Sequence, residues 1–83
     1  MYEGINPKII ASIRRYADEH VAPGGFLVAV LSNSLSGAVF TADDDNLNVL
    51  PEIVRYCYNE IPGDCWGSLD IVRQWVAARE VKP

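Results

Sequence analysis

Apolar residues along most of this chain recur every three or four positions, the spacing of one face of an α-helix. The first such segment starts at Asn6-Pro7, where Asn suits the cap and Pro suits the first turn. Its apolar positions are Ile9, Ile10, Ile13, Tyr16 and Ala17. The pattern predicts a helix from Pro7 to about Glu19 or His20, ending before the next proline.

The segment that follows Gly24-Gly25 is apolar, uncharged and too short to span a membrane. We expect a helix that starts at Gly24 or Gly25, since its apolar positions fit helical spacing: Leu27, Val30, Leu31 and Leu35. Ser32-Asn33-Ser34 interrupts this pattern, so either one helix continues through Val39 or a second helix begins with Ser34 as its cap. The density of β-branched residues leaves a strand as an open alternative for residues 26–41.

A third helix is signalled by Asp43-Asp44-Asp45-Asn46, since short acceptor side chains and negative charge suit a helix N-terminus. The apolar stripe that follows is the cleanest in the chain: Leu47, Leu50, Ile53, Val54, Cys57, Tyr58 and Ile61. Pro51 is tolerated only in a first turn, so the regular helix is expected to begin close to Leu50. Pro62-Gly63 ends it.

The last helix is expected after Gly67-Ser68, with Ser68 as cap and Asp70 in the first turn. Its buried side is marked by Val72, Trp75 and Val76. Together these segments predict an all-α protein, a compact bundle of about four short helices in one domain over residues 1–83.

Composition adds two expectations about partners. A chain of 83 residues buries only roughly 60% of its unfolded surface, so its core is thin and we expect a homo-oligomer, with a dimer as the default. The net charge is −4, from 11 acidic and 7 basic residues, which opposes binding to nucleic acids and to anionic membranes. The adjacent pair Arg14-Arg15 is the one local exception.

The two cysteines and the first residues bear on the cellular compartment. Met1–Gly4 has neither a basic n-region nor an apolar h-region, so we expect a cytoplasmic protein. Cys57 and Cys65 are then expected as free thiols. A disulfide remains the alternative, because the turn at Pro62-Gly63 can bring the two cysteines together.

No arrangement of residues indicates a catalytic or metal centre. Asp43-Asp44-Asp45 lacks the spaced ligands and the glycine of a calcium-binding loop, and the cap interpretation is favoured. His20 is the single histidine and there are two cysteines, a composition that argues against zinc. We therefore expect a protein that is not an enzyme and uses no cofactor.

Two sets of residues are candidates for binding. Gly24 and Gly25 at a helix start, with Arg14 and Arg15, could hold a nucleotide-like anion; alternatively, the glycines serve a sharp turn and close helix packing. The second set consists of aromatic residues that either anchor a protein interface or close the core: Trp66, Tyr56 and Tyr58.

Several runs of the sequence resemble small proteins of tailed bacteriophages and prophages. The similar residues are Pro23–Leu27, Ala29–Leu35, Ala42-Asp43, Asn46, Ile53-Val54, Tyr56, Tyr58-Asn59, Trp66–Ser68 and Trp75. The resemblance implies a phage-type accessory protein in a bacterial cytoplasm, and it transfers no catalytic or binding residue. Such a protein is expected to bind and block a host defence component, with a small signalling molecule as the alternative partner.

Overall fold

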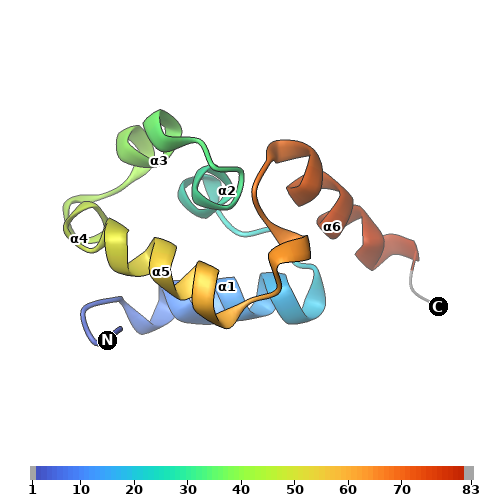
Figure 1. The fold of residues 1–83 in the computed structure, drawn as a ribbon, viewed down its shortest axis with the longest axis horizontal. Helices are drawn as coiled ribbons and strands as arrows, with labels where there is room; N and C mark the ends of the chain where they lie inside the picture. Colours follow the sequence, from blue (N-terminus) through green and yellow to red (C-terminus); the bar gives the residue numbers. More distant parts are fainter. Residues whose placement is uncertain (1, 82–83) are drawn as a thin grey trace.

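The computed structural model describes residues 2–81, and within this range the chain folds into helices and contains no strand (Figure 1). In chain order the elements are α1 (Pro7–Glu19), α2 (Gly25–Leu31), α3 (Leu35–Thr41), α4 (Asp44–Asn48), α5 (Leu50–Glu60), the 3-10 helix η1 (Gly63–Cys65) and α6 (Leu69–Val81). The all-α class is confirmed. The expectation of about four helices is wrong, because the described range holds six α-helices.

The first additional helix arises at Ser32–Ser34. Asn33 adopts the left-handed conformation, with φ of 61°, and this interrupts the helical path after α2. The Ser34 hydroxyl accepts a hydrogen bond from the Gly37 N–H at 3.3 Å and caps α3. The alternative of a new helix capped by Ser34 is therefore confirmed, and the strand alternative for residues 26–41 is wrong.

The second additional helix arises because α4 and α5 do not join. The Asp43 carboxylate accepts a hydrogen bond from the Asn46 N–H at 2.8 Å, but the helix that it caps ends at Asn48. A continuous helix would place the ring of Pro51 against the Leu47 carbonyl and would lack one hydrogen bond. The regular helix accordingly begins at Leu50, as Pro51 predicted.

Other helix ends follow the predicted signals. The Asn6 side chain accepts a hydrogen bond from the Lys8 N–H at 2.9 Å, and α1 ends at Glu19 with His20 as its left-handed C-cap. The Ser68 hydroxyl accepts from the Ile71 N–H at 3.2 Å at the start of α6. Local capping chemistry therefore determines these boundaries.

One cluster of buried apolar side chains joins the helices. Its largest fully buried members are Tyr16, Ile13, Leu31, Ile53, Cys57 and Cys65. Close approach of α2 and α3 requires Gly37, because a Cβ atom there would lie 2.7 Å from the Ser34 Oγ and 3.3 Å from the Ala29 Cβ. The described chain measures 39 × 24 × 18 Å, with α6 projecting at one end (Figure 1).

Candidate protein-binding surface

Three large apolar side chains on α3 and α5 remain outside the core. The exposed fraction is 75% for Leu35, 85% for Phe40 and 78% for Tyr58. Leu35 and Tyr58 belong to the apolar patterns that predicted the core, yet no other element covers them. Where uncovered apolar side chains border a depression of the surface, they are typical of an interaction site.

Tyr58 lies beside a shallow hollow of about 330 Å³ at the end of α5. We call this the aromatic hollow, and the residues that line it are Asn33, Tyr58, Gly63, Trp66 and Gly67. Trp66 is half-buried and packs against the core, so only part of its indole is accessible. Two of the predicted interface residues, Tyr58 and Trp66, therefore share one site.

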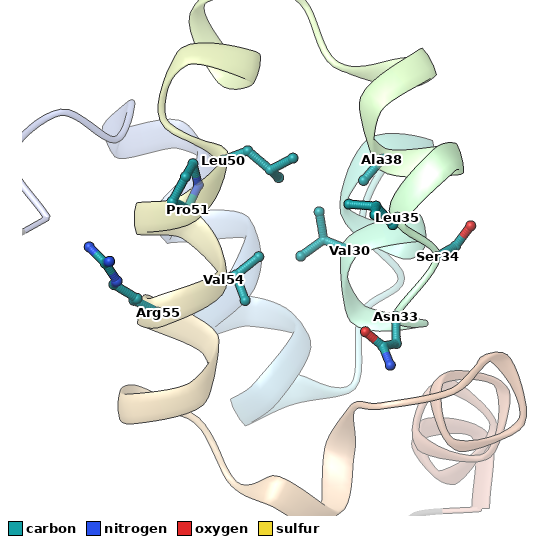
Figure 2. A pocket seen from close by; sticks show the side chains of 9 residues that line it. All are labelled: Val30, Asn33, Ser34, Leu35, Ala38, Leu50, Pro51, Val54 and Arg55. Carbon is teal, nitrogen blue, oxygen red and sulfur yellow. The ribbon is translucent and has the colours of Figure 1, made fainter.

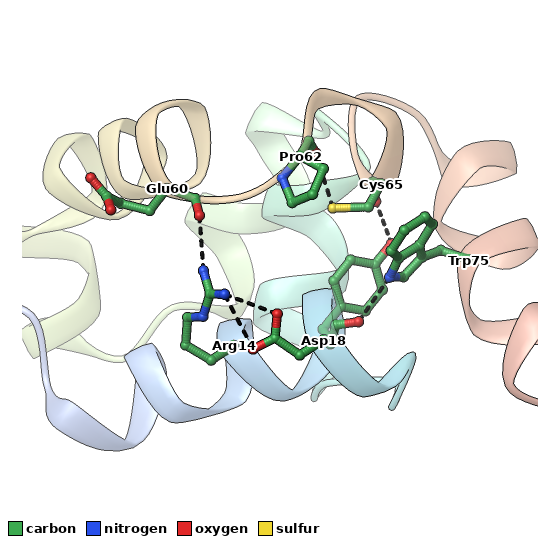
Figure 3. A network of polar contacts seen from close by, with 7 residues as sticks. Arg14, Asp18, Glu60, Pro62, Cys65 and Trp75 are labelled. Carbon is green, nitrogen blue, oxygen red and sulfur yellow. Dashed lines mark hydrogen bonds and ion pairs between the residues drawn. The ribbon is translucent and has the colours of Figure 1, made fainter.

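Hydrogen bonds position the loop that carries Trp66. The Gly67 N–H donates to the Leu31 carbonyl at 2.7 Å, which fastens the loop to the end of α2. The Tyr16 hydroxyl donates to the Cys65 carbonyl at 2.5 Å, and the Cys65 thiol donates to the Pro62 carbonyl at 3.1 Å (Figure 3). The hollow is therefore built on a fixed loop, which lowers the entropy cost of binding.

A second depression, the α3–α5 groove, has a volume of about 540 Å³. Figure 2 shows Leu50 and Val54 of α5 facing Leu35 and Ala38 of α3, with Val30 of α2 between them. Polar residues occur at its margins: Asn33, Ser34 and Arg55. The Arg55 side chain extends from α5 on the side away from α3 (Figure 2). Asn33 lines both depressions, so the groove and the aromatic hollow adjoin.

Tyr56, the third predicted interface residue, is a core residue instead. Only 8% of its surface is exposed. The N-terminal segment covers it, since the Tyr2 ring meets the Tyr56 ring edge-on with centroids 5.0 Å apart. The Tyr2 hydroxyl also accepts a hydrogen bond from the Asn59 amide at 3.1 Å. The spacing of apolar residues within α5 could not predict that the N-terminal segment packs over Tyr56.

Arg14, one of the residues of the predicted anion site, finds its polar partners within the chain. The Arg14 guanidinium donates to the Asp18 carboxylate at 2.9 Å and to the Glu60 carbonyl at 2.8 Å (Figure 3). Arg15 is exposed and makes no hydrogen bond or ion pair among the described residues 2–81. A Cβ atom at Gly24 or Gly25 would meet nothing within 4 Å, so close helix packing does not explain these glycines.

The two cysteines are free and buried, in agreement with the predicted free thiols. Burial, with a smaller contribution from the neighbouring Cys65 thiol, raises the pKa of Cys57 to about 12. Burial also raises the pKa of Cys65. Both groups are therefore protonated near neutral pH, which makes them poor nucleophiles and poor metal ligands.

Neither a metal cluster nor a membrane helix is found in the described part of the chain. No group of three or more His, Cys, Asp and Glu side chains is placed to hold a metal ion among these residues. Over the same residues, no helix combines the length and the hydropathy needed to cross a bilayer. The aromatic hollow and the α3–α5 groove remain the principal features for a functional hypothesis.

Comparisons of the chain with protein-family models, with curated proteins and with solved structures gave no match. The functional hypothesis therefore draws on the exposed surface.

Proposed function

We propose that this chain is a non-enzymatic, phage-type accessory protein that binds a bacterial host protein through the aromatic hollow. The observation that carries the proposal is the 78% exposed ring of Tyr58 beside the partly exposed indole of Trp66. Tyr and Trp are over-represented among the residues that dominate protein–protein binding energy, since they offer large, rigid and amphipathic contact areas. The resemblance to phage proteins supports a host component as the target.

The surroundings of the hollow define the partner's chemistry. Asp64 of η1 is exposed next to Gly63, and the whole chain carries a net charge of −4. The Asn33 side chain makes no hydrogen bond to the described residues, so its amide can donate to and accept from a partner backbone. The segment that fits is a basic, extended stretch of a host protein with an apolar side chain that inserts between Tyr58 and Trp66.

The test uses affinity-tagged protein purified from bacterial cells. The wild type is expected to retain a host protein at a fixed stoichiometry, and Tyr58→Ala is expected to lose it. Truncating a central aromatic anchor costs about 2 kcal/mol, so titration calorimetry with the purified partner should show roughly 30-fold weaker binding. Leu69→Ala on α6 is the matched control, because it removes a 43% exposed side chain outside the hollow and should bind normally.

Two results would overturn the proposal. One is a partner that binds the wild type and Tyr58→Ala with equal affinity. The other is a discrete small anion, such as a nucleotide, released from denatured protein that carries no host protein, which would favour the small-ligand alternative.

A further inference from the structure

The side chains that line the aromatic hollow carry hydrogen-bond donors that the described residues leave unused. Tyr58 is largely exposed, and its hydroxyl makes no hydrogen bond to residues 2–81. The Trp66 indole N–H is also unbonded within this range. Solvent reaches it, because the Ser32 hydroxyl is the single buried side-chain polar group without a partner there. With the free Asn33 amide, three lining residues each offer a donor to a partner.

These donors distinguish among the conformations that a bound peptide can adopt. A helix uses its carbonyl groups for its own hydrogen bonds, and an added β-strand needs a strand edge with which to pair. Residues 2–81 contain no strand. A polyproline II segment has no internal hydrogen bonds, so its carbonyl groups are free to accept. Its prolines also carry no N–H group that docking would leave unpaired.

The shape of the hollow suits a proline ring. Tyr58 and Trp66 supply rigid aromatic surfaces, and Gly63 and Gly67 complete the lining without side chains, so a partner's backbone can approach closely. The volume of about 330 Å³ lies at the small end of the range for ligand sites, about 300–1,000 Å³. Depressions lined by aromatic residues bind proline-rich segments, whose preformed conformation lowers the entropy cost of binding.

The charge beside the hollow indicates what flanks the prolines. Asp64 directly follows Gly63, is exposed and forms no ion pair with the described residues. Consecutive Cα atoms lie about 3.8 Å apart, so the backbone of Asp64 adjoins the lining of the hollow. A basic residue next to the prolines complements this carboxylate and the net charge of −4.

We propose that the aromatic hollow binds a proline-rich segment in the polyproline II conformation, flanked by an arginine or a lysine. The carbonyl groups of this segment accept hydrogen bonds from Tyr58, Trp66 and Asn33, and a proline ring packs against the two aromatic side chains. The inference rests on the proposed function, since it assigns the conformation and the residue type of the segment that is bound at the same site.

Synthetic peptides test the inference without the host partner. The probe is an acetylated oligoproline that ends in arginine, labelled for fluorescence anisotropy. The control peptide has alanine in place of every proline. The wild-type protein is expected to bind the proline peptide more tightly than the alanine peptide by about tenfold or more, since only the former is preformed and lacks backbone donors.

Protein variants separate the aromatic surface from the donor. Tyr58→Ala is expected to weaken binding of the proline peptide by about tenfold or more. Trp66→Phe keeps an apolar ring but loses the indole N–H, so binding is expected to weaken by about 2- to 10-fold, the value of one hydrogen bond. Phe40→Ala is the matched control, because it truncates an 85% exposed aromatic side chain on α3 that does not line the hollow. Helical circular dichroism checks that each variant is folded.

NMR spectra of the indole N–H groups locate the contact. The chain has two tryptophans, and Trp66→Phe identifies the Trp66 signal by its loss. The Trp66 signal is expected to shift as the proline peptide is added. The Trp75 signal should stay in place, because its N–H is already donated to the Tyr16 carbonyl.

A proline peptide that binds the wild type no more tightly than the alanine peptide would overturn the inference. So would a Trp66 signal that does not move at about 1 mM peptide, a concentration that detects even weak binding. Neither result affects the host-capture measurement, in which loss of a host protein by Tyr58→Ala still supports the proposed function. Conversely, equal capture by the wild type and Tyr58→Ala overturns the proposed function whatever the peptides do.

Discussion

Gly67 holds the loop between η1 and α6 in a conformation that few residues can adopt. Its φ is 129°, a region that L side chains rarely enter. Glycine adopts this φ without strain, and the same residue donates its N–H to the Leu31 carbonyl. A substitution at this position would therefore affect both the loop conformation and the hydrogen bond. The orientation of Trp66, and with it the aromatic hollow, follows from the conformation at Gly67.

We expect Gly67→Ala to lower the free energy of unfolding by about 1–3 kcal/mol, because the new side chain is strained at this φ. Gly25→Ala is the matched control. Gly25 is the first residue of α2 with open space around it, so alanine should leave stability unchanged or raise it by up to about 1 kcal/mol. Urea denaturation of both variants measures the difference, and equal stability would contradict the role assigned to Gly67.

The Cys57 thiol couples stability to alkaline pH. Its folded-state pKa is about 12, against a reference value of 9.0. A group whose pKa is raised on folding contributes to the free energy of unfolding. That contribution is complete at pH values below the pKa of the unfolded state and is lost as the pH rises towards the pKa of the folded state. The folded protein should therefore lose stability above about pH 9 and not below it.

At pH 10 the expected loss from Cys57 is about 1–2 kcal/mol relative to pH 7. Cys57→Ala should be less stable than the wild type at pH 7 because it leaves a cavity, but its stability should fall less between pH 7 and pH 10. Urea titrations of both proteins at the two pH values give the comparison. An equal loss of stability between pH 7 and pH 10 in both proteins would show that Cys57 is not the group responsible.

At the scale of elements, α6 depends on contacts around Trp75. The Trp75 Nε1–H donates to the Tyr16 carbonyl at 2.8 Å, and His20 Nδ1–H donates to the Trp75 carbonyl at 2.7 Å. The two rings also stack, with centroids 4.2 Å apart. Trp75 and the end of α1 thus connect the projecting helix to the body of the molecule (Figures 1 and 3).

Trp75→Ala is expected to release α6 by local unfolding at a cost of about 2–3 kcal/mol, while α1 and α5 keep most of their protection. Hydrogen exchange followed by NMR should show amides of α6 exchanging at least tenfold faster than in the wild type. Leu69→Ala, on the same helix but away from the Tyr16 contact, is the control. Equal loss of protection in all helices would show that α6 does not open separately.

The sequence patterns predicted that these segments form helices, but they did not predict every point at which one helix ends and the next begins. Capping residues such as Asn6 and Ser68 act within three residues, so local sequence contains the whole signal. The separation of α4 from α5 falls at Val49, where the backbone leaves the helical conformation two residues before Pro51. Periodicity shows that a segment is helical but not where two helices meet.

At the scale of the whole molecule, periodicity could not show which apolar faces become covered. Tyr58 fits the apolar stripe of α5 but remains exposed, whereas Tyr56 is covered by Tyr2 from the N-terminal segment. Which face is covered depends on contacts between residues more than 50 positions apart. The aromatic hollow could thus be predicted in part from residue type, but its location required the fold.

The distribution of charge over the molecule leads to a last prediction, that this protein does not bind nucleic acid non-specifically. The net charge is −4, and the guanidinium of Arg14 is already paired with Asp18. Arg55 lies on α5 and Arg73 on α6, so the cations are spread over separate helices. Non-specific affinity comes mainly from several cations that neutralise phosphates together.

Fluorescence anisotropy with random duplex and single-stranded DNA at about 50 mM salt is the most permissive test, and no saturable binding is expected. Arg14→Ala serves as the control for the adjacent basic pair and should leave the result unchanged. Tight binding that weakens steeply with salt would show that the arginines act together, and it would replace the host-protein hypothesis with a nucleic-acid-binding one.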